Sequence, residues 1–304
     1  MNKDYFLKTR ILDGGMGQAL LANGLEPKGS LWSATALIEK KYHELVIKTH
    51  LEFIESGADV IVTNNFSARR VRMLQNNVNE HFNYANQKAG ELALKAKEIS
   101  KKNILIAGSL PAQNDTYMED LRDEKIIEKA FYDQAILLKP FIDFYYLDVL
   151  SGSKECKIAL NVIEKLNLPA LVGLHIKKNG KLPSNESISE VVKKCKSKNW
   201  LGLIFACVSP EIIEKSADEI KKLNLPFGYK VNLWKTEEPI PVHKFASPTD
   251  KIAANPVETM GTRSEYTEEK FLKFSKKMMS KGATILGGCC ETKPSHIKKI
   301  SQLK

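Results

Sequence analysis

The chain has 304 residues, of which 43% are hydrophobic and 27% are charged, a composition typical of a soluble globular protein. No stretch reaches the ~18 consecutive apolar residues of a membrane span, and the first residues lack the apolar core of a signal peptide. The net charge of +10 comes from lysines spread through amphipathic segments, without the interleaved aromatic residues of a single-strand groove. It therefore indicates solvated helix faces and no nucleic-acid partner.

Eight short apolar runs recur along the chain, and each is continuous, as is typical of parallel strands buried on both faces. They span residues 10–12, 59–63, 104–108, 144–147, 170–175, 201–206, 228–232 and 283–286. Stretches with helical periodicity lie between them, at 36–56, 69–102, 120–140, 153–166, 187–198, 210–223 and 267–281.

These alternations in ~300 residues predict a (β/α)8 TIM barrel, with a doubly wound open sheet as the alternative. No linker or low-complexity segment divides the chain, so we expect residues 1–304 to form a single domain. The longest irregular stretch, 235–264, contains Pro239, Pro241, Pro248 and Pro256, and we expect it to form a loop over one end of the barrel.

Polar residues follow several strands, at the barrel end where (β/α)8 enzymes carry their chemistry. Asp13 follows the first strand, Asn65 the second and Asp148 the fourth, while Asn232 ends the seventh. A carboxylate that leaves a buried strand, such as that of Asp148, needs a partner, which is either a ligand cation or a backbone cap.

The segment Asp13-Gly14-Gly15-Met16-Gly17 places three glycines after the first strand. Its spacing is not that of a dinucleotide-binding fingerprint. Glycines allow close approach of a ligand, and successive N–H groups can form a nest for a carboxylate or phosphate. The other interpretation is a plain tight turn.

Three cysteines end two of the strands. Cys289 and Cys290 follow Gly287-Gly288 after the eighth strand, and Cys207 follows the sixth. Adjacent cysteines cannot easily bridge each other, whereas both can ligate one metal ion where the backbone turns sharply. Because strands six and eight lie two apart around a barrel, we expect a site of three thiolates with one open position, which is the catalytic kind of zinc site.

The cysteine content bears on metal identity and compartment. Thiolates favour zinc, and soft copper(I) is the alternative that ligand type leaves open. Cys156 and Cys195 lie in predicted helices, where we expect them to pack in the core. Five cysteines form a small, odd set, which indicates a reducing cytoplasm.

The aromatic and imidazole side chains give weaker signals. Trp32 lies just before a predicted helix and is either a core anchor or an aromatic wall for a cationic methyl group. His175, His243 and His296 have no metal-ligand spacing to one another, so we expect structural or surface roles.

Three segments resemble the zinc-dependent homocysteine S-methyltransferase family. Residues 13–17 are similar to its opening Asp-Gly-Gly-Met/Phe-Gly motif, and residues 56–66 to its Ala-Gly-Ala-Asp…Thr-Asn-Thr-Phe/Tyr segment. Residues 287–297 resemble its Gly-Gly-Cys-Cys-Gly-Thr…Pro-x-His-Ile ending. The resemblance spans almost the whole chain and implies a (β/α)8 barrel. It also implies that Cys207, Cys289 and Cys290 bind Zn2+, with homocysteine thiolate as the fourth ligand.

The same resemblance implies roles in substrate binding. Asp13 and Asp148 would hold the amino group of homocysteine, and the amides of Gly14 and Gly15 its carboxylate. Four further residues complete the substrate site that we expect: Asn65, Asn232, Trp32 and Phe66.

The chain departs from the family pattern near the site. Asp148 stands where the family usually has Glu, Ala206 where it has Asn, and Glu291 where it has Gly. Residues 173–176 also differ from the usual Ser-Phe-Thr. These changes leave the zinc ligands intact and leave open whether the acceptor is homocysteine or another thiol.

The donor is expected to be a small onium compound. No folate or cobalamin module is recognised, which disfavours a stand-alone methionine synthase. Trp32 and Phe66 match the aromatic wall of the betaine type, but Ser67 and Val149 stand where it has two tyrosines. We therefore favour a sulfonium donor, S-methylmethionine or S-adenosylmethionine, with betaine as the alternative.

Two other classes of function stay open at this stage. One is a zinc hydrolase, although three thiolates make zinc a poor Lewis acid. The other is a non-catalytic thiol- or zinc-binding protein. The expected partners are small molecules only, in a monomer or small homo-oligomer.

Overall fold

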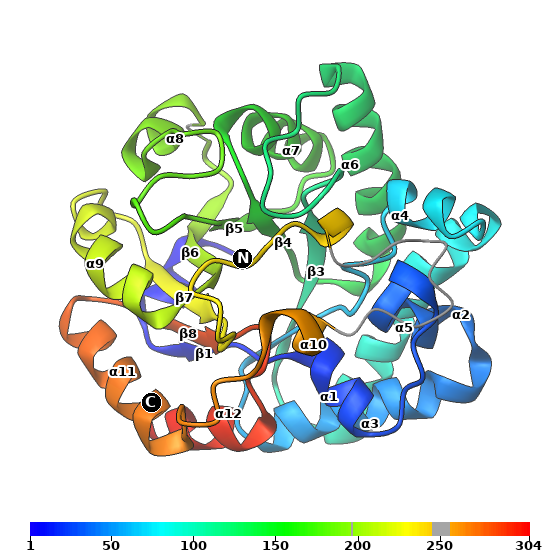
Figure 1. Ribbon diagram of the computed structural model, residues 1–304, viewed down its shortest axis with the longest axis horizontal. Coiled ribbons are helices and arrows are strands. Elements are labelled where there is room, and N and C mark those ends of the chain that lie inside the picture. The colour runs from blue at the N-terminus through cyan, green and yellow to red at the C-terminus, as the bar shows by residue number, and fades with distance from the viewer. Residues whose placement is uncertain (196, 245–255) are drawn as a thin grey trace.

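The computed structural model describes residues 1–195, 197–244 and 256–304. Eight parallel strands form one sheet in the order β1-β8-β7-β6-β5-β4-β3-β2 (Figure 1). The two end strands meet, because Asp59 N donates to Ile11 O at 2.7 Å and Asp13 N donates to Val60 O at 3.0 Å. The predicted (β/α)8 barrel is therefore confirmed, and the open-sheet alternative is wrong.

Each of the eight predicted apolar runs overlaps one strand. The strands are β1 (Arg10–Ile11), β2 (Val60–Val62), β3 (Leu105–Pro111), β4 (Phe144–Leu150), β5 (Ala170–Leu174), β6 (Trp200–Val208), β7 (Phe227–Val231) and β8 (Ile285–Gly288).

The helices form the outer layer around the strands (Figure 1). They are α1 (Met16–Ala22), α2 (Thr35–Ile38), α3 (His43–Glu55), α4 (Arg70–Gln75), α5 (Phe82–Ser100), α6 (Glu124–Leu138), α7 (Ser153–Lys165), α8 (Ile188–Lys194), α9 (Pro210–Lys221), α10 (Pro256–Met260), α11 (Glu268–Ser280) and α12 (Pro294–Ile300). Short 3-10 turns are η1 (Lys3–Leu7), η2 (Gly29–Ala34), η3 (Lys40–Tyr42), η4 (Asn79–His81), η5 (Lys139–Phe141), η6 (Val242–Lys244) and η7 (Ser301–Leu303). Within the described part of the chain, no helix has the length and apolarity that a membrane span requires.

Two predicted helices are wrong as single elements. The stretch 36–56 divides into α2, η3 and α3, and the stretch 69–102 divides into α4, η4 and α5. In the second case Asn77 has φ of 55°, a left-handed conformation that ends α4. Helical periodicity continues across such breaks because both pieces pack the same face on the sheet.

The periodicity also missed three short helices, α1, α10 and α12. Helix α10 lies inside the stretch 235–264 that we expected to be irregular. Figure 1 shows α10 and the segment after β7 crossing in front of the barrel. Pro248 and residue 196, the latter in a predicted helix, lie outside the described residues.

Apolar side chains fill two layers. A large cluster lies between the strands and the helices, and a smaller one lies inside the barrel. Phe6, from η1, belongs to the inner cluster and packs edge-on against Phe144, with ring centroids 5.7 Å apart. Because Phe144 begins β4, this contact fills the N-terminal end of the barrel and leaves the opposite end for a cavity.

Strands β4 and β6 extend beyond their predicted ends. Each carries a register shift there, between Leu147 and Leu150 in β4 and between Ala206 and Val208 in β6. At the shifts, Val149 has φ of 62° and Cys207 has φ of 53°. A bulge of this kind inserts one residue and re-aims a side chain.

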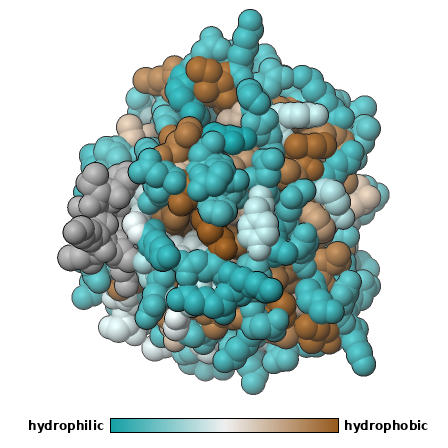
Figure 2. All heavy atoms as spheres, turned by 90° about the vertical axis from the view of Figure 1, so that its right-hand side faces the viewer, coloured by the Kyte–Doolittle hydropathy of each residue, from teal (hydrophilic) through white to brown (hydrophobic). Residues whose placement is uncertain are grey.

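The molecular surface is mostly polar. The face shown in Figure 2 is largely hydrophilic, with separate hydrophobic areas between the polar side chains. This arrangement is what a chain with many lysines on solvated helix faces is expected to have.

Candidate active site

A single cavity collects the polar and sulfur-bearing residues at the C-terminal ends of the strands. The cavity, together with its part that is open to solvent, has a volume of about 1060 Å³ that no atom occupies. Its lining includes Asp13, Asp148 and the three cysteines of the predicted metal site. Pro256 and Met260 of α10 also line it, so the segment after β7 covers the cavity as the sequence predicted.

The three thiols meet at the floor of this cavity. Cys290 Sγ lies 3.7 Å from Cys207 Sγ and 3.8 Å from Cys289 Sγ, and all three sulfurs lie within 4.8 Å of one another. The group can hold a metal ion. Cys207 lies within β6 and not after it, which corrects the predicted boundary. Its position at the bulge makes both Ala206 and Cys207 part of the cluster inside the barrel.

Backbone hydrogen bonds to residues at the end of β7 hold Cys289 and Cys290 in place. Cys289 N donates to Val231 O at 2.7 Å, and Leu233 N donates to Cys290 O at 3.1 Å. Asn232 Nδ2 donates to Cys207 O at 2.6 Å. Strand β7 lies between β6 and β8, so its end holds the ligands of both neighbours at a set distance.

The contacts among the three thiols shift their pKa values in opposite directions. Contacts with the Cys289 and Cys290 thiols hold the pKa of Cys207 well below its ordinary value. The same contacts raise the pKa of Cys289 and of Cys290. A hydrogen bond of 3.1 Å also joins Tyr117 Oη and Cys207 Sγ.

Tyr117 was missed by the sequence analysis. It lies in the long loop between β3 and α6, has φ of 67°, and lines the cavity. Its ring packs on His175, with centroids 4.6 Å apart. Because nothing in the local sequence marks this residue, only the fold of the loop brings it to the sulfur.

Asp13 has a partner that the sequence analysis did not consider. Its Oδ2 accepts from Val62 N at 2.7 Å, and its Oδ1 contacts the ammonium of Lys230, which also donates to Asp13 O at 3.2 Å. Both side chains are buried. Burial raises the pKa of Asp13 above its ordinary value. A lysine within a strand buried on both faces was the available signal for this ion pair.

Asp148 lies inside β4, at the bulge, and not after the strand as predicted. Its Oδ2 accepts from Ser109 Oγ at 3.0 Å. Burial raises the pKa of Asp148 to about 7, and the nearby Cys289 contributes to this rise. The Tyr146 hydroxyl group also lies near this carboxyl group. A carboxylate can accept about four hydrogen bonds, so Asp148 keeps capacity for a cationic ligand.

The glycine loop is more constrained than a free nest of amides. Gly15 N donates to Thr292 O at 2.9 Å, so this amide is already engaged. A Cβ on Gly15 would lie 2.6 Å from Cys289 O, which explains the glycine by close packing against the cysteine turn. The Gly15 amide is thus not free to bind a substrate carboxylate as predicted, although both Gly14 and Gly15 line the cavity.

Asn65 and Asn232 lie in the framework around the cavity and not in its lining. Asn65 is fully buried, and its Nδ2 donates to Asn86 Oδ1 at 3.0 Å and to Ser109 O at 3.1 Å. Asn232 is fully buried beneath Cys207. Their predicted contact with substrate has no support in this geometry, because their amides are engaged with the protein.

Aromatic rings form one wall of the cavity. Trp32 and Phe66 both line it, as do Ser67 and Val149, which replace the expected tyrosines. Trp32 has φ of 47°, and its indole lies so close to Gly17 that a Cβ there would be 2.4 Å from Cζ2.

Tyr117 and Trp234 add two aromatic side chains to this lining. The sequence analysis counted only Trp32 and Phe66. These two rings come from the β3–α6 loop and from the segment after β7. No sequence motif links them to Trp32 and Phe66.

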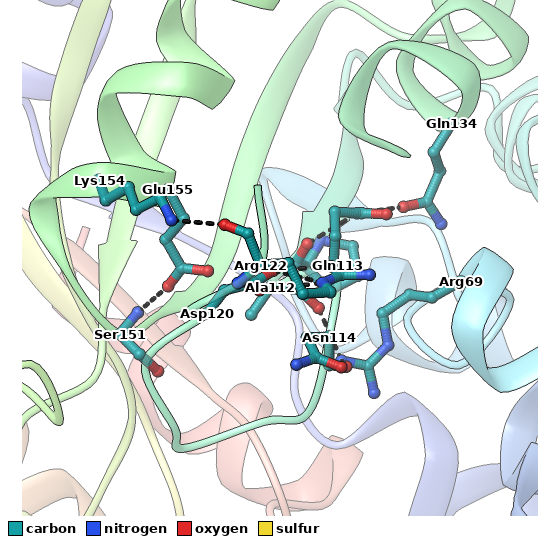
Figure 3. Close-up of polar contacts among 11 residues, drawn as sticks. Arg69, Ala112, Gln113, Asn114, Asp120, Arg122, Gln134, Ser151, Lys154 and Glu155 are labelled. Atoms are coloured by element: carbon teal, nitrogen blue, oxygen red, sulfur yellow. Dashed lines mark hydrogen bonds and ion pairs between the residues drawn. The ribbon is translucent and has the colours of Figure 1, made fainter. Parts of the chain in front are cut away.

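Two buried arginines line the cavity beside the aromatic wall. Arg69 Nη1 donates to Ala112 O at 2.7 Å and to Asn114 O at 3.0 Å, and thereby holds the β3–α6 loop (Figure 3). Arg72 Nη2 lies 3.7 Å from Asp115 Oδ1. The predicted motifs did not include either arginine.

Comparison with known proteins agrees with this architecture. Residues 10–303 match the family model described as homocysteine S-methyltransferase. Homocysteine S-methyltransferase 1 of Arabidopsis thaliana is 25% identical, over 96% of this chain and 92% of the relative. Selenocysteine methyltransferase of Astragalus bisulcatus is 22% identical, over 97% and 92%. The metallated form of the homocysteine methyltransferase MmuM from Escherichia coli superposes with a TM-score of 0.78 at 19% identity, over 98% of this chain and 96% of that one, and so shares the fold.

Proposed function

The chain belongs to the homocysteine S-methyltransferase family, and we propose that it transfers a methyl group from a small onium donor to the thiol of homocysteine, giving methionine. The observation that carries this proposal is the group of three thiols on the floor of the cavity. Membership of a methyltransferase family disfavours the zinc-hydrolase alternative.

The thiol geometry supports zinc as the metal. Sulfur ligands placed ~2.3 Å from zinc in a tetrahedral array lie about 3.8 Å apart. Two of the three sulfur separations, 3.7 and 3.8 Å, match this value, and all three sulfurs lie within 4.8 Å of one another. Cys207, Cys289 and Cys290 would hold the ion, and the cavity faces the remaining position. A zinc ion bound there would lower the pKa of a substrate thiol enough to make it a thiolate at neutral pH.

The buried charges support a zwitterionic acceptor. We propose that Asp148 and Asp13 bind the amino group of homocysteine, as the family resemblance implies. Lys230 neutralises part of Asp13, so Asp148 carries the larger share of this contact. The shorter side chain of Asp148 is compensated by the bulge in β4, which carries residues 148 and 149 toward the cavity.

The chemical step is a displacement in line. A lone pair of the homocysteine thiolate forms the new S–CH3 bond, and the bond from the donor's onium atom to the methyl group breaks. Its electron pair stays on the donor, which leaves as a neutral thioether or amine. No protein base is needed once the thiol is ionised, so the cavity contributes by aligning the two substrates and excluding water.

The donor is proposed to be a sulfonium compound, S-methylmethionine or S-adenosylmethionine. Ser67 and Val149 leave the wall without the two tyrosines of a betaine cage. Betaine is the alternative, and the added rings of Tyr117 and Trp234 favour it, since each supplies a face for a cation.

A second acceptor also has specific support. The relative from Astragalus bisulcatus is named for selenocysteine, so a selenol belongs in the acceptor screen.

All five cysteines of the chain are free, as we expect for a protein of the reducing cytoplasm.

The test is transfer of a labelled methyl group by the purified protein loaded with zinc. We expect labelled methionine from homocysteine with at least one sulfonium donor, and none with Cys290→Ala. Betaine, a selenol acceptor and cysteine are run in parallel. Full zinc loading without transfer from any donor would refute the proposal and favour a zinc-binding protein without catalysis.

A further inference from the structure

We propose that Arg69 and Arg72 form a carboxylate anchor for the methyl donor, so that the donor is a zwitterion with an onium group at one end and a carboxylate at the other. This inference rests on the proposed function and deepens it, because it names the residues that would bind the carboxylate of the donor. It also assigns a binding role to two residues outside the metal site and the aspartates.

Arg69 is a buried cation with unused hydrogen-bonding capacity. It is 1% exposed, and Nη1 donates its hydrogen bonds to Ala112 O, Asn114 O and Thr116 Oγ1. Its Nε is buried and has no partner among the described residues. Burial lowers the pKa of Arg69 to about 9, which still leaves the guanidinium charged at neutral pH. A buried charge whose contacts are mainly carbonyl groups favours an anionic ligand.

Arg72 places a second guanidinium on the same wall. Its side chain is 5% exposed and lines the cavity. Asp115 is its ion-pair partner at 3.7 Å, and the other oxygen of Asp115 contacts His243. One carboxylate thus lies near two arginines, so this part of the cavity lining carries an excess of positive charge.

A second group of lining residues has the reverse character. It comprises the three thiols and Asp148, together with the neutral pair of Asp13 and Lys230. A donor must present its cationic methyl-bearing atom to this group for transfer to occur. Its other end then meets the arginines, where planar guanidinium groups match a carboxylate by paired hydrogen bonds.

The aromatic wall suits the middle of such a donor molecule. The Arg69 guanidinium lies 5.0 Å from the centre of the Phe66 ring, so the anchor and the aromatic wall adjoin. Trp32 Nε1 and both polar atoms of the Asn64 side chain are buried without partners among the described residues. These groups line the same cavity and can bind polar atoms of the donor.

The test compares a sulfonium carboxylate, dimethylsulfoniopropionate, with its methyl ester, which keeps the cation and removes the negative charge. We expect wild-type enzyme to prefer the acid in kcat/KM and in affinity measured by calorimetry without homocysteine. Arg72→Gln should reduce the acid-to-ester ratio roughly 10- to 100-fold, the effect of losing a charge-assisted hydrogen bond. Zinc content and homocysteine affinity should stay unchanged, and the ester should lose much less than the acid.

Two further variants guard the interpretation. Arg70→Gln is the matched control, because Arg70 begins the same helix but pairs with Asp133 outside the cavity lining. It should leave the acid-to-ester ratio unchanged. Arg69→Lys keeps a charge that can hold the loop while removing Nε, and it should lower the ratio as Arg72→Gln does.

The outcomes separate this inference from the proposed function. Equal losses for acid and ester in Arg72→Gln would overturn the anchor, since that pattern means a general disturbance of the loop. A raised homocysteine dissociation constant would overturn it in favour of an acceptor site. A preference for the acid in calorimetry that is lost in Arg72→Gln supports the anchor even if no methyl group reaches homocysteine, which would count against the proposed function alone.

Discussion

Two residues with left-handed backbone conformations, Cys207 and Val149, shape the site. Strands normally direct alternate side chains inward, yet Ala206 and Cys207 both join the cluster inside the barrel. A non-glycine residue with positive φ costs roughly 1–2 kcal/mol. The fold accepts this cost at the two bulges, which place the candidate metal ligand Cys207 beside the other thiols and re-aim the backbone beside Asp148.

The metal site leads to the first prediction. We expect about one zinc ion per chain in the purified protein, and Cys290→Ala should lose most of it, because three thiolates become two. Elemental analysis after dialysis measures the content. Cys156→Ala and Cys195→Ala are the matched controls, since both are buried and neither belongs to the metal group. Undiminished zinc in Cys290→Ala would show that the metal lies elsewhere.

The two aspartates should respond differently to removal of their charge. Asp148→Asn should weaken homocysteine binding roughly 10- to 100-fold, the loss of one charge-assisted hydrogen bond, without loss of stability. Asp13→Asn should also reduce the free energy of unfolding by about 3–5 kcal/mol, because it leaves the buried ammonium of Lys230 unpaired. Calorimetry and urea denaturation measure the two effects. If Asp148→Asn binds homocysteine as tightly as the wild type, the assigned role is wrong.

At the scale of elements, the position of Trp32 in the aromatic wall depends on how η2 packs on α1. Trp32 interrupts η2 with φ of 47°, and its indole occupies the space that a side chain at Gly17 would fill. Asn76, which follows α4, accepts from Ser30 N at 3.1 Å and donates to Ser30 Oγ at 2.8 Å, so η2 is also fixed to the helix of the arginine pair. The wall is thus assembled from three elements that are separate in sequence.

Gly17→Ala should displace the Trp32 indole, because the new methyl group would lie 2.4 Å from Cζ2. Alanine is the better helix former, so α1 should persist. We expect the KM for the donor to rise about 2- to 30-fold, the range of a lost cation–π contact of ~0.5–2 kcal/mol. Steady-state kinetics with donor varied measures this, and zinc content should not change. Trp32→Phe, which keeps an aromatic face without the clash, should have the smaller effect; the opposite order would contradict the assignment.

The β3–α6 loop is the element that sequence reasoning could least anticipate. Asp120 and Arg122 form a two-point ion pair in it, with Nη2 and Oδ2 2.6 Å apart, and Lys154 of α7 donates to Arg122 O at 2.5 Å (Figure 3). Arg69 holds its other end. A loop fixed at both ends can present Tyr117 to Cys207 in one position, which explains how an unmarked tyrosine enters the site.

At the scale of the whole molecule, barrel closure depends on one acidic side chain as well as on the backbone. Asp59 Oδ2 accepts from Ile11 N at 2.8 Å, and Asp59 Oδ1 accepts from the ammonium of Lys304 at 2.7 Å. These bonds cover the seam between β1 and β2, where the strands are short. The C-terminal residue thereby contacts the edge at which the barrel closes.

The stability of the whole molecule should depend on the pH through Glu155. This carboxyl group lies near Ser151 N and the Asp120–Arg122 pair (Figure 3), and burial raises its pKa to about 8 from an ordinary value of 4.5. Between these pH values the folded protein keeps a proton that the unfolded chain releases. The stabilisation that this proton provides is complete below about pH 4.5 and is lost as the pH rises through about 8.

Glu155→Gln removes this titration while retaining an oxygen that can accept from Ser151 N. We expect the variant to gain stability over the wild type as the pH rises from 5 to 8, by at most about 1.4 kcal/mol per pH unit. Urea denaturation at pH 5, 6.5 and 8 measures the difference. Glu164→Gln, at an exposed position of the same helix, should show no such trend. A difference that is constant with pH would rule out the assigned titration.

The sequence by itself determined the barrel, the eight strand positions and the three candidate ligands. Continuous apolar runs follow directly from burial on both faces of a parallel sheet, and Gly287-Gly288-Cys289-Cys290 is a local signal that needs no distant partner. The helix break at Asn77 and the continuation of β4 past Asp148 and of β6 past Cys207 were beyond it. The bulges in these two strands are fixed by pairing with neighbouring strands, which the local sequence does not record.

Only the tertiary structure decided what surrounds the thiols. Lys230 reaches Asp13 across 217 residues of chain, and Tyr117 reaches Cys207 across 90. The tertiary structure also showed that the backbone amide of Gly15 and the side-chain amides of Asn65 and Asn232 form hydrogen bonds within the protein. The partner of a buried polar group is set by which strands close the barrel and which loops fold over it, and neither is recorded in the residues next to that group.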